Sequence, residues 1–278
     1  MLFRSPVSAL EGDNVVNKSE KTPWYDGPTV LHVLENVHVG SDLNVRDFRF
    51  PVQYVIRPDL NFRGYAGRIV AGSVNPGEEI AVLPSGLISK VKTITTMDGD
   101  LEEAHAPQSV VLTLEDEIDI SRGDMIVRRH NLPQVENNID VILCWMGNDP
   151  LEIGKNYFLK HTTRTVNASI TKLIYMFDVN TLHRTDATEH NLFCELIKTP
   201  HLTDVNTLLL NEIGRAELKL TQPIMLDQYN KNRETGSFII IDPDTNFTVG
   251  AGMIRGAVRS IEETIHVEGK TNIEEELP

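Results

Sequence analysis

The sequence has few cysteines and no long hydrophobic run, and each shortage argues against a class of protein. None of its apolar segments approaches the length of a transmembrane helix. Residues 1–6 lack the charged-then-apolar order of a signal peptide, so we expect a cytoplasmic protein without a membrane partner. The two cysteines, Cys144 and Cys194, lie inside apolar runs with no partner at metal-ligand spacing, which predicts buried free thiols.

Basic residues are scarce relative to acidic ones. The chain has 26 Lys and Arg against 40 Asp and Glu, which gives a formal net charge of −14. Binding to nucleic acid requires basic side chains concentrated on one surface to neutralise phosphates. The composition therefore argues against a nucleic-acid partner, and the dense basic cluster at residues 128–130 is interpreted as the solvated end of a strand.

The familiar patterns of catalytic and metal-binding residues are also missing. The nine histidines include no pair at i, i+4 spacing beside a glutamate, as a zinc-binding helix would have. The acidic run at residues 115–119 lacks the spacing of a calcium loop and is expected to be a solvated loop. Ser237 follows a glycine but has no second glycine to form a nucleophile elbow, so it is expected to be a strand residue. We assign no catalytic residue and no metal ligand.

The most informative stretch is residues 235–254. Four apolar residues, 238–241, lead into Asp242-Pro243 and out again through residues 247–249, which predicts a β-hairpin with a locally specified turn. An unbroken apolar run predicts that both faces of the first strand are covered, one by a barrel core and the other by a neighbouring domain. Gly250 and Gly252 are expected where the second strand bends or lets another backbone approach.

Short strand-like segments separated by turn residues fill most of the remaining chain, so the predicted fold is mainly β, with two small antiparallel β-barrels. The first barrel is expected over residues 44–133 and the second over 134–256, meeting near the hairpin. An acidic tail, residues 257–278, is expected to be flexible. The predicted strands are 50–56, 67–74, 79–83, 89–95, 109–114 and 125–128 in the first barrel, and 138–146, 155–159, 163–177, 214–220, 224–225 and the hairpin in the second.

The first 43 residues have a different pattern. Residues 2–7 are predicted to form a short buried strand, and Pro28 is placed at the first position of a helix that ends near Gly40. The helix has an apolar stripe consisting of Val30, Leu31, Leu34 and Val37. One strand and one helix cannot bury such a stripe between them. We therefore expect residues 1–42 either to pack on the barrels or to mediate self-association.

Five motifs together resemble one protein family. They are residues 8–16 (SALEGDNVV), 23–29 (PWYDGPT), 48–58 (FRFPVQYVIRP), 114–124 (LEDEIDISRGD) and 210–215 (LNEIGR). In these segments the chain is similar to the large, GTPase subunit of bacterial sulfate adenylyltransferase, a member of the elongation factor Tu-like superfamily. The resemblance extends over about residues 1–256.

The resemblance implies a domain order and a role. Residues 1–43 would be the C-terminal remnant of a P-loop GTPase domain, followed by β-barrel domains II (44–133) and III (134–256) of translation-factor type. In that family the small catalytic subunit, the partner in a heterodimer, converts ATP and sulfate to adenylyl sulfate and pyrophosphate, and this nucleotidyl transfer is coupled to GTP hydrolysis on the large subunit. The barrels would carry the coupling and partner-binding surfaces.

The nucleotide-binding motifs of the family are not in this sequence. It has no Gly-x-x-x-x-Gly-Lys-Ser/Thr loop for phosphates, no Asp-x-x-Gly for the metal side and no Asn-Lys-x-Asp for guanine. Ser8, Ala9 and Leu10 match the last guanine-contacting loop, which cannot hold a nucleotide alone. We expect no GTP or Mg²⁺ to be bound by this chain and no activity from it in isolation.

One segment departs from the family. The sequence Asp-Val-Asn-Thr-Leu at residues 178–182 recurs at 204–208, which predicts a local duplication on the surface of the second barrel and leaves open an extra strand at 192–197. Two other functions stay open: a translation-factor-like barrel pair that binds RNA, and a stand-alone interaction module. The acidic charge and the motifs at 48–58 and 114–124 favour the sulfate adenylyltransferase reading over the RNA-binding one.

Overall fold

The computed structural model describes residues 5–37, 44–59, 62–177, 184–186 and 207–258. The chain divides into two compact units, residues 1–42 and 43–278. The described parts contain one short helix and otherwise strands and turns, which confirms the mainly β fold class. All but the first two residues of the predicted tail, and most of the duplicated segment, including residues 192–197 and Cys194, lie outside the described residues.

The first unit is held by turns around one buried asparagine. Asn14 is almost fully buried, and its side-chain amide donates to the carbonyl of Pro6 and to Thr22 Oγ1, both at 2.8 Å. Helix α1, Val30–Asn36, follows Thr29, whose hydroxyl accepts from the N–H of His32. With Thr29 as the N-cap, Pro28 lies two positions before the first helical residue, Val30, so the placement of Pro28 at the first helical position was wrong.

Two further expectations for this unit need correction. Residues 5–8 form no strand, and Val7 is 53% exposed, because the Pro6 carbonyl accepts from the Asn14 side chain and not from a neighbouring strand. The helix ends at Asn36 rather than near Gly40, with Val37 as its C-cap. No side chain of α1 is buried, and Leu34 is 66% exposed. The apolar stripe of the helix is therefore real and uncovered by its own unit.

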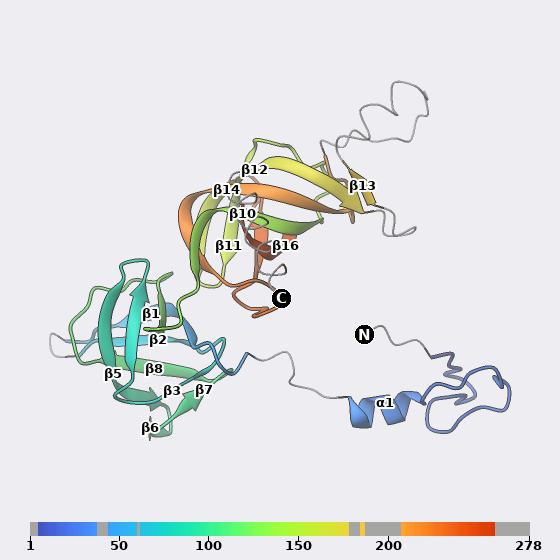
Figure 1. The fold of residues 1–278 in the computed structure, drawn as a ribbon, viewed down its shortest axis with the longest axis horizontal. Helices are drawn as coiled ribbons and strands as arrows, with labels where there is room; N and C mark the ends of the chain where they lie inside the picture. The colour runs from blue at the N-terminus through green and yellow to red at the C-terminus, as the bar shows by residue number, and fades with distance from the viewer. Residues whose placement is uncertain (1–4, 38–43, 60–61, 178–183, 187–206, 259–278) are drawn as a thin grey trace, which may run out of the picture. The chain divides into compact units, whose positions relative to one another are not determined.

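The first barrel is a closed ring of six antiparallel strands (Figure 1). Hydrogen bonding runs in the order β4-β9-β1-β2-β8-β5 and returns to β4, so the ring has no free edge. The strands are β1 (Arg49–Ile56), β2 (Gly64–Arg68), β4 (Glu79–Leu83), β5 (Leu87–Thr96), β8 (Ser109–Leu114) and β9 (Met125–Arg128), with β6 (Gly99–Leu101) added at β5.

One predicted strand of this barrel is split. The expected strand 67–74 ends as β2 at Arg68, and β3 (Ser73–Val74) pairs instead with β7 (Ala104–His105), which the sequence did not suggest. Between them the chain turns so that Ala71 forms a bridge with Arg49. The interior is filled by the inward side chains of the ring, with Phe48 and Phe50 stacked at a centroid distance of 6.4 Å.

The second barrel repeats the design with longer strands. Its ring order is β11-β15-β16-β10-β14-β12, closed by pairing of β12 with β11. The predicted strands 214–220 and 224–225 are one strand, β14, whose register shifts opposite residues 136–138. The elements are β10 (Gln134–Trp145), β11 (Asn156–His161), β12 (Arg164–Phe177), β13 (Arg184–Asp186, paired with β12), β14 (Ile213–Leu226), β15 (Ser237–Ile241) and β16 (Thr248–Ala257).

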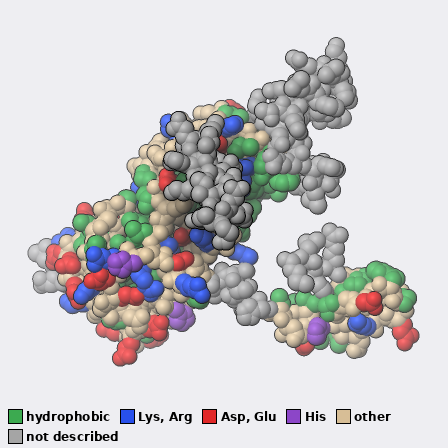
Figure 2. All heavy atoms as spheres, in the orientation of Figure 1, with side chains coloured by type: hydrophobic (Ala, Val, Ile, Leu, Met, Phe, Trp, Pro, Cys, Tyr) green, Lys and Arg blue, Asp and Glu red, His purple; other side chains and the backbone are tan. Residues whose placement is uncertain are grey.

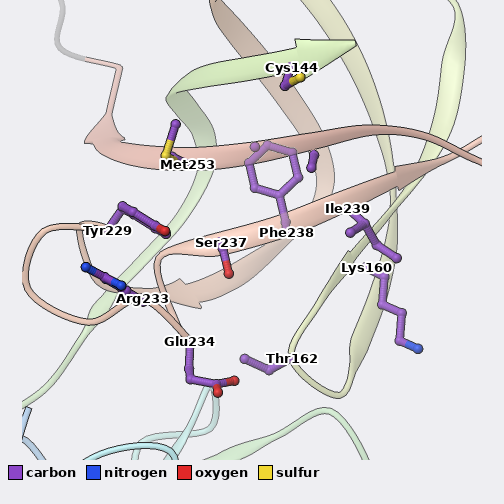
Figure 3. Close-up of a pocket in the computed structure, with 12 residues that line it drawn as sticks. Cys144, Lys160, Thr162, Tyr229, Arg233, Glu234, Ser237, Phe238, Ile239 and Met253 are labelled. Atoms are coloured by element: carbon purple, nitrogen blue, oxygen red, sulfur yellow. The ribbon is translucent and has the colours of Figure 1, made fainter. Parts of the chain in front are cut away.

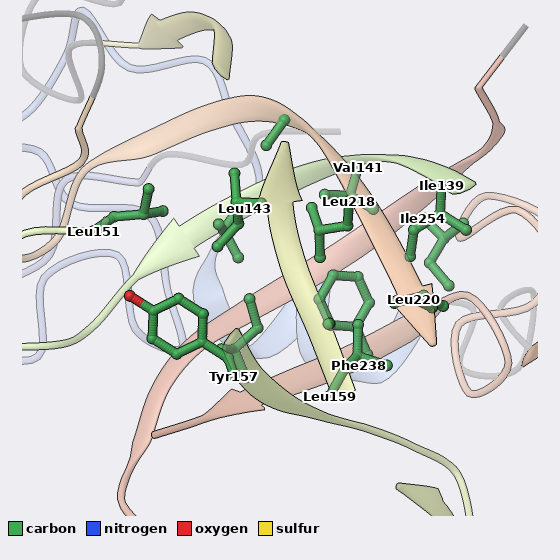
Figure 4. Close-up of a cluster of buried hydrophobic side chains, with 14 of the residues drawn as sticks. Ile139, Val141, Leu143, Leu151, Tyr157, Leu159, Leu218, Leu220, Phe238 and Ile254 are labelled. Atoms are coloured by element: carbon green, nitrogen blue, oxygen red, sulfur yellow. The ribbon is translucent and has the colours of Figure 1, made fainter. Parts of the chain in front are cut away.

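The core of the second barrel is a single apolar cluster (Figure 4). Side chains of every ring strand point into it, and Trp145 packs edge-on against Tyr157 at a centroid distance of 5.7 Å. Leu208, the last residue of the second Asp-Val-Asn-Thr-Leu copy, is fully buried there, and the Thr207 hydroxyl donates to the carbonyl of Leu151 at 2.7 Å. The end of that copy is therefore part of the core of the second barrel.

The predicted hairpin is present, with one correction. Strand β15 begins at Ser237 and pairs with β16, and Asp242 Oδ1 accepts from the backbone N–H groups of Asp244 and Thr245, each at 3.0 Å. Phe238 and Ile240 are buried, whereas Ile239 and Ile241 are only partly so. The prediction that both faces are covered was therefore wrong, because successive side chains of a strand point to opposite faces and the outer face of β15 is open.

Candidate functional site

The two barrels meet at the end of β14, and Glu234, just before the predicted hairpin, faces Arg68 of the first barrel at 4.0 Å. Met225 is buried in an apolar cluster with side chains of β4 and β9 of the first barrel. The cluster consists of Ala81, Leu83, Met125, Val127 and Met225. Among the described contacts between the barrels, none involves residues 238–249. We call the contact region formed by this cluster and by Arg49, Asn131 and Asp227 the barrel junction.

Arg49 is the centre of the polar part of the junction. Its side chain projects from β1 and the residue is 1% exposed. The guanidinium donates to both carboxylate oxygens of Asp227, at 2.9 and 3.0 Å. It also donates to the Phe48 carbonyl at 3.0 Å and to the backbone and side-chain oxygens of Asn131 at 2.7 and 3.1 Å. All five N–H donors of the guanidinium are thus used, which is the condition under which a buried arginine is tolerated.

The network continues from Asp227 to a buried histidine. The Thr235 hydroxyl donates to Asp227 Oδ2 at 2.7 Å, and the Thr235 carbonyl lies 2.8 Å from His161 Nε2. Because a carbonyl oxygen can only accept, Nε2 carries the proton in this arrangement. Burial lowers the pKa of His161, against the opposing effects of the Thr235 carbonyl and the nearby Asp227 charge. The imidazole is therefore neutral at physiological pH.

The loop from Asp227 to Gly236 joins the junction to an external groove. Asp227 and Thr235 face the junction, whereas Tyr229, Arg233 and Glu234 line the groove. The loop is tightly closed: a Cβ atom on Gly236 would lie 2.4 Å from Tyr229 Cα and 2.5 Å from the Asn232 carbonyl. Its backbone is tied to β16 by the bonds from Tyr229 N to Ile254 O and from Ile254 N to Gly236 O, at 2.9 and 2.7 Å.

The groove is a hollow of about 660 Å³ on the outer face of β10, β11, β15 and β16 (Figure 3). Phe238, Ile239, Ala251 and Met253 contribute apolar surface to it. Its charged lining residues are Lys160, Arg233 and Glu234. The other lining residues are Cys144, Thr162, Tyr229, Ser237 and Gly252. Cys144 faces this groove as a free thiol, as predicted, but it is half-buried and not buried.

Ser8, Ala9 and Leu10 lie in a tight turn of the first unit. The Ser8 N–H donates to the Asp13 carbonyl at 3.3 Å, the Gly12 N–H to the Ser8 carbonyl at 2.9 Å, and Leu10 is 95% exposed. With the Ser8 amide engaged inside the turn and no phosphate-binding loop in residues 5–37, the described residues do not fit GTP or its Mg²⁺. Their match to a guanine-contacting loop stays a prediction.

Other charged segments that the sequence singled out are engaged locally. Arg128 and Arg129 pair with Glu78 and Glu79, at 2.6 and 2.8 Å. In the acidic run, the Ile118 carbonyl accepts from the Tyr65 hydroxyl at 2.7 Å, so part of this loop is anchored to the first barrel. On the visible face of this barrel acidic and basic side chains are mixed (Figure 2).

The described residues contain neither a metal-binding cluster nor a membrane-spanning helix. No group of three or more His, Cys, Asp and Glu side chains in the described ranges is placed to hold a metal ion. No helix in the part of the chain that the structure describes is long and apolar enough to cross a membrane.

Comparison with known proteins gives relatives at high identity. The chain is 52% identical over 249 residues to sulfate adenylyltransferase subunit 1 of Alteromonas mediterranea, covering 90% of this chain and 49% of the relative. It is also 52% identical over 249 residues to the bifunctional enzyme CysN/CysC of Rhodopirellula baltica, covering 36% of that protein. The chain is homologous to the C-terminal part of sulfate adenylyltransferase subunit 1. These identities confirm the resemblance to the subunit 1 sequences seen in the sequence.

Two further comparisons agree with this placement. Residues 138–255 match the family model described as GTP-eEF1A C-terminal domain-like. Structures of Sup35 complexed with GMPPNP and with GDP superpose with TM-scores of 0.63 and 0.65, at 21% and 20% identity, and show the same fold. The chain spans about half the length of the subunit 1 relatives it matches.

The sequence pointed to neither the junction nor the groove. One signal was available for the junction: Arg49 stands between Phe48 and Phe50 where a strand enters a barrel. A charged residue so placed needs a buried acceptor set, which only a second domain could supply. The groove had a weaker signal, since Ile239 and Ile241 break the polar-out alternation of a half-exposed strand.

Proposed function

We propose that this chain supplies the two β-barrel domains through which a sulfate adenylyltransferase subunit 1 acts on its catalytic partner. In this role, GTP hydrolysis on a GTPase domain would drive the synthesis of adenylyl sulfate and pyrophosphate from ATP and sulfate on the small catalytic subunit. The observation that carries the proposal is 52% identity to subunit 1 over 249 residues, which include both barrels.

The geometry supports a coupling role in a physical sense. A domain pair can transmit a rearrangement only if its parts move together, and the junction joins the barrels by a fully bonded buried arginine and an apolar cluster. Each barrel closes its own ring and fills its own core. The residues of this chain would therefore bind and position the partner, and the adenylyl-transfer residues would belong to the catalytic subunit.

The test is complex formation followed by activity. The chain is co-expressed with a subunit 2 from an organism whose subunit 1 it resembles, and the complex is measured by light scattering after size exclusion. The expected result is a one-to-one complex. A chimera of these barrels with the GTPase domain of that subunit 1 should give GTP-dependent pyrophosphate release. No complex and no rescue by the chimera would refute the proposal.

The runner-up, an RNA-binding barrel pair, has no specific observation in its favour. The Sup35 likeness is one of fold alone, and the net charge of −14 opposes phosphate binding. Filter binding with tRNA at low salt discriminates between the two: retention that weakens steeply as salt rises would favour the RNA-binding function instead.

A further inference from the structure

The outer face of the second barrel is apolar where a solvated sheet is expected to be polar. In the strand register, Cys144 lies opposite Ala251, Ala251 opposite Ile239, and Ile239 opposite Lys160. This row therefore crosses four strands, β10, β16, β15 and β11, on the outer face. In the adjacent row Met253 lies opposite Ser237 and is 39% exposed. One face of an antiparallel sheet normally meets water with polar side chains, so this face has the composition of a contact surface.

The hollow in that face lies where the outward side chains are small. Ala251 and Ser237 point outward from β16 and β15, whereas Gly252 and Phe238, which lie opposite each other, face the barrel core. The larger side chains of Tyr229 and Met253 lie at one side of the groove (Figure 3). The result is a trough that can receive a large apolar side chain.

The rim of the groove is basic on a chain that is strongly acidic. Lys160 and Arg233 lie at opposite ends of the groove (Figure 3). The one carboxylate that lines it, Glu234, faces Arg68 of the first barrel at 4.0 Å. Two of the three charged side chains that line it are therefore basic, on a chain whose formal net charge is −14, and Arg233 lies over the Tyr229 ring at 6.0 Å. Such a rim favours an acidic occupant over a basic one and over a second copy of this acidic chain.

The pairing of the strands determines how an occupant can bind. Both β15 and β16 are hydrogen-bonded on each side, to β11 and β10 as well as to each other. A peptide consequently cannot join the sheet as an added strand. Contact must come from side chains inserted between the outward residues. The polar groups converge on the rim rather than on the floor, which suits a protein segment better than a small polar molecule.

We propose that this groove docks a segment of a partner protein that inserts a large apolar side chain between Tyr229, Ile239 and Met253 and carries Asp or Glu beside it. An acidic side chain would meet Lys160 at one end of the groove. This goes beyond the proposed function, because it specifies the surface and the chemistry of the segment whichever protein carries it. Docking would press on the loop from Asp227 to Gly236, which also holds the barrel junction.

The experiment measures fluorescence anisotropy of three labelled twelve-residue peptides with the full chain. The first has a central Phe-Leu pair flanked by Glu; the second has Lys in place of Glu; the third has Gly in place of Phe-Leu. The first is expected to bind at least tenfold more tightly than the other two. Ala251→Arg, which fills the floor, should weaken its binding at least tenfold, and Lys160→Glu several-fold.

A matched control is Lys219→Glu, which makes the same charge change on the exposed face of β14. It should leave binding unchanged, and circular dichroism spectra should show that all variants are folded. Equal binding of the three peptides, no binding of any, or binding unaffected by Ala251→Arg and Lys160→Glu would overturn the proposal. Self-association abolished by Met253→Asp would assign the groove to a second copy and overturn it too. Failure to bind subunit 2 would refute the proposed function without deciding this inference.

Discussion

Replacing Arg49 with methionine tests whether the junction holds the barrels as one unit. The substitution keeps an apolar stem of similar length but removes five hydrogen bonds, two of them to the Asp227 carboxylate. That carboxylate, whose side chain is 10% exposed, would then keep the hydrogen bond from the Thr235 hydroxyl but lose its charged partner. Removing one partner of a buried ion pair costs about 3–5 kcal/mol. Since domains are stable by about 5–15 kcal/mol, the loss would be large.

Trp145 makes the measurement selective. The chain has two tryptophans, and Trp145 is buried in the second barrel whereas Trp24 is exposed in the first unit. In urea, Trp145 fluorescence follows the second barrel and far-ultraviolet circular dichroism follows both. In the parent the two signals should change together. In Arg49→Met they should separate, and the midpoint should fall.

A second variant distinguishes the ion pair from the surrounding packing. Arg49→Met combined with Asp227→Leu removes both charges, and should recover about half of the loss, because the uncompensated carboxylate is gone. Arg129→Met breaks an exposed pair with Glu79 and serves as the control, with a midpoint close to that of the parent. If Arg49→Met lowers the unfolding free energy by less than about 1 kcal/mol, the size of a surface pair, and the two signals still coincide, the junction does not act as inferred here.

Three other predictions concern different parts of the chain. Burial lowers the pKa of His161, so the contribution of the neutral imidazole to stability is complete above about pH 6.5 and is lost as pH falls through the lower folded pKa. His161→Gln should therefore flatten the dependence of the urea midpoint on pH between 5 and 7.5, and an unchanged slope would contradict this. Gly252→Ala should destabilise the second barrel by about 1–3 kcal/mol through a clash with Phe238, and adding Phe238→Leu should reduce the effect of that alanine. Deleting residues 1–42 should leave the barrels folded and abolish any self-association that runs through the exposed apolar stripe of α1; unfolding of the truncated chain would contradict this.

The sequence predicted the elements whose signals are local. Strands 79–83, 109–114 and 125–128 have the predicted bounds, and the hairpin turn forms because Asp242 can bond its own turn. The strand predictions failed where a contact with a distant part of the chain determines the local structure. The strand 67–74 is broken by a bridge from Ala71 to Arg49. The error in the helix was local: Thr29 caps it, so it begins at Val30, two residues after Pro28.

The site was harder to predict than the fold because its parts are far apart in sequence. The groove combines residues from β10, β11, β15 and β16 with the loop from Asp227 to Gly236, and a periodicity argument on one strand cannot assemble them. It could show only that Ile239 and Ile241 were apolar, and we assigned that outer face to a neighbouring domain. The register across four strands was needed to find a row of small and apolar residues.

The junction also sets an order of events during synthesis. The last strand of the first barrel ends at Arg128, whereas Arg49 is bonded to Asp227, 178 residues further along the chain than Arg49. About a hundred residues must follow Arg128 before that carboxylate exists, which takes about 5–20 s at a typical rate of roughly 5–20 residues per second. During this interval the ring of the first barrel can close, but Arg49 still lacks its carboxylate partner. Four apolar side chains beside it, those that later contact Met225, are also uncovered. A nascent chain in this state offers a natural binding surface to a chaperone, and ribosome pausing before codon 227 would lengthen its exposure.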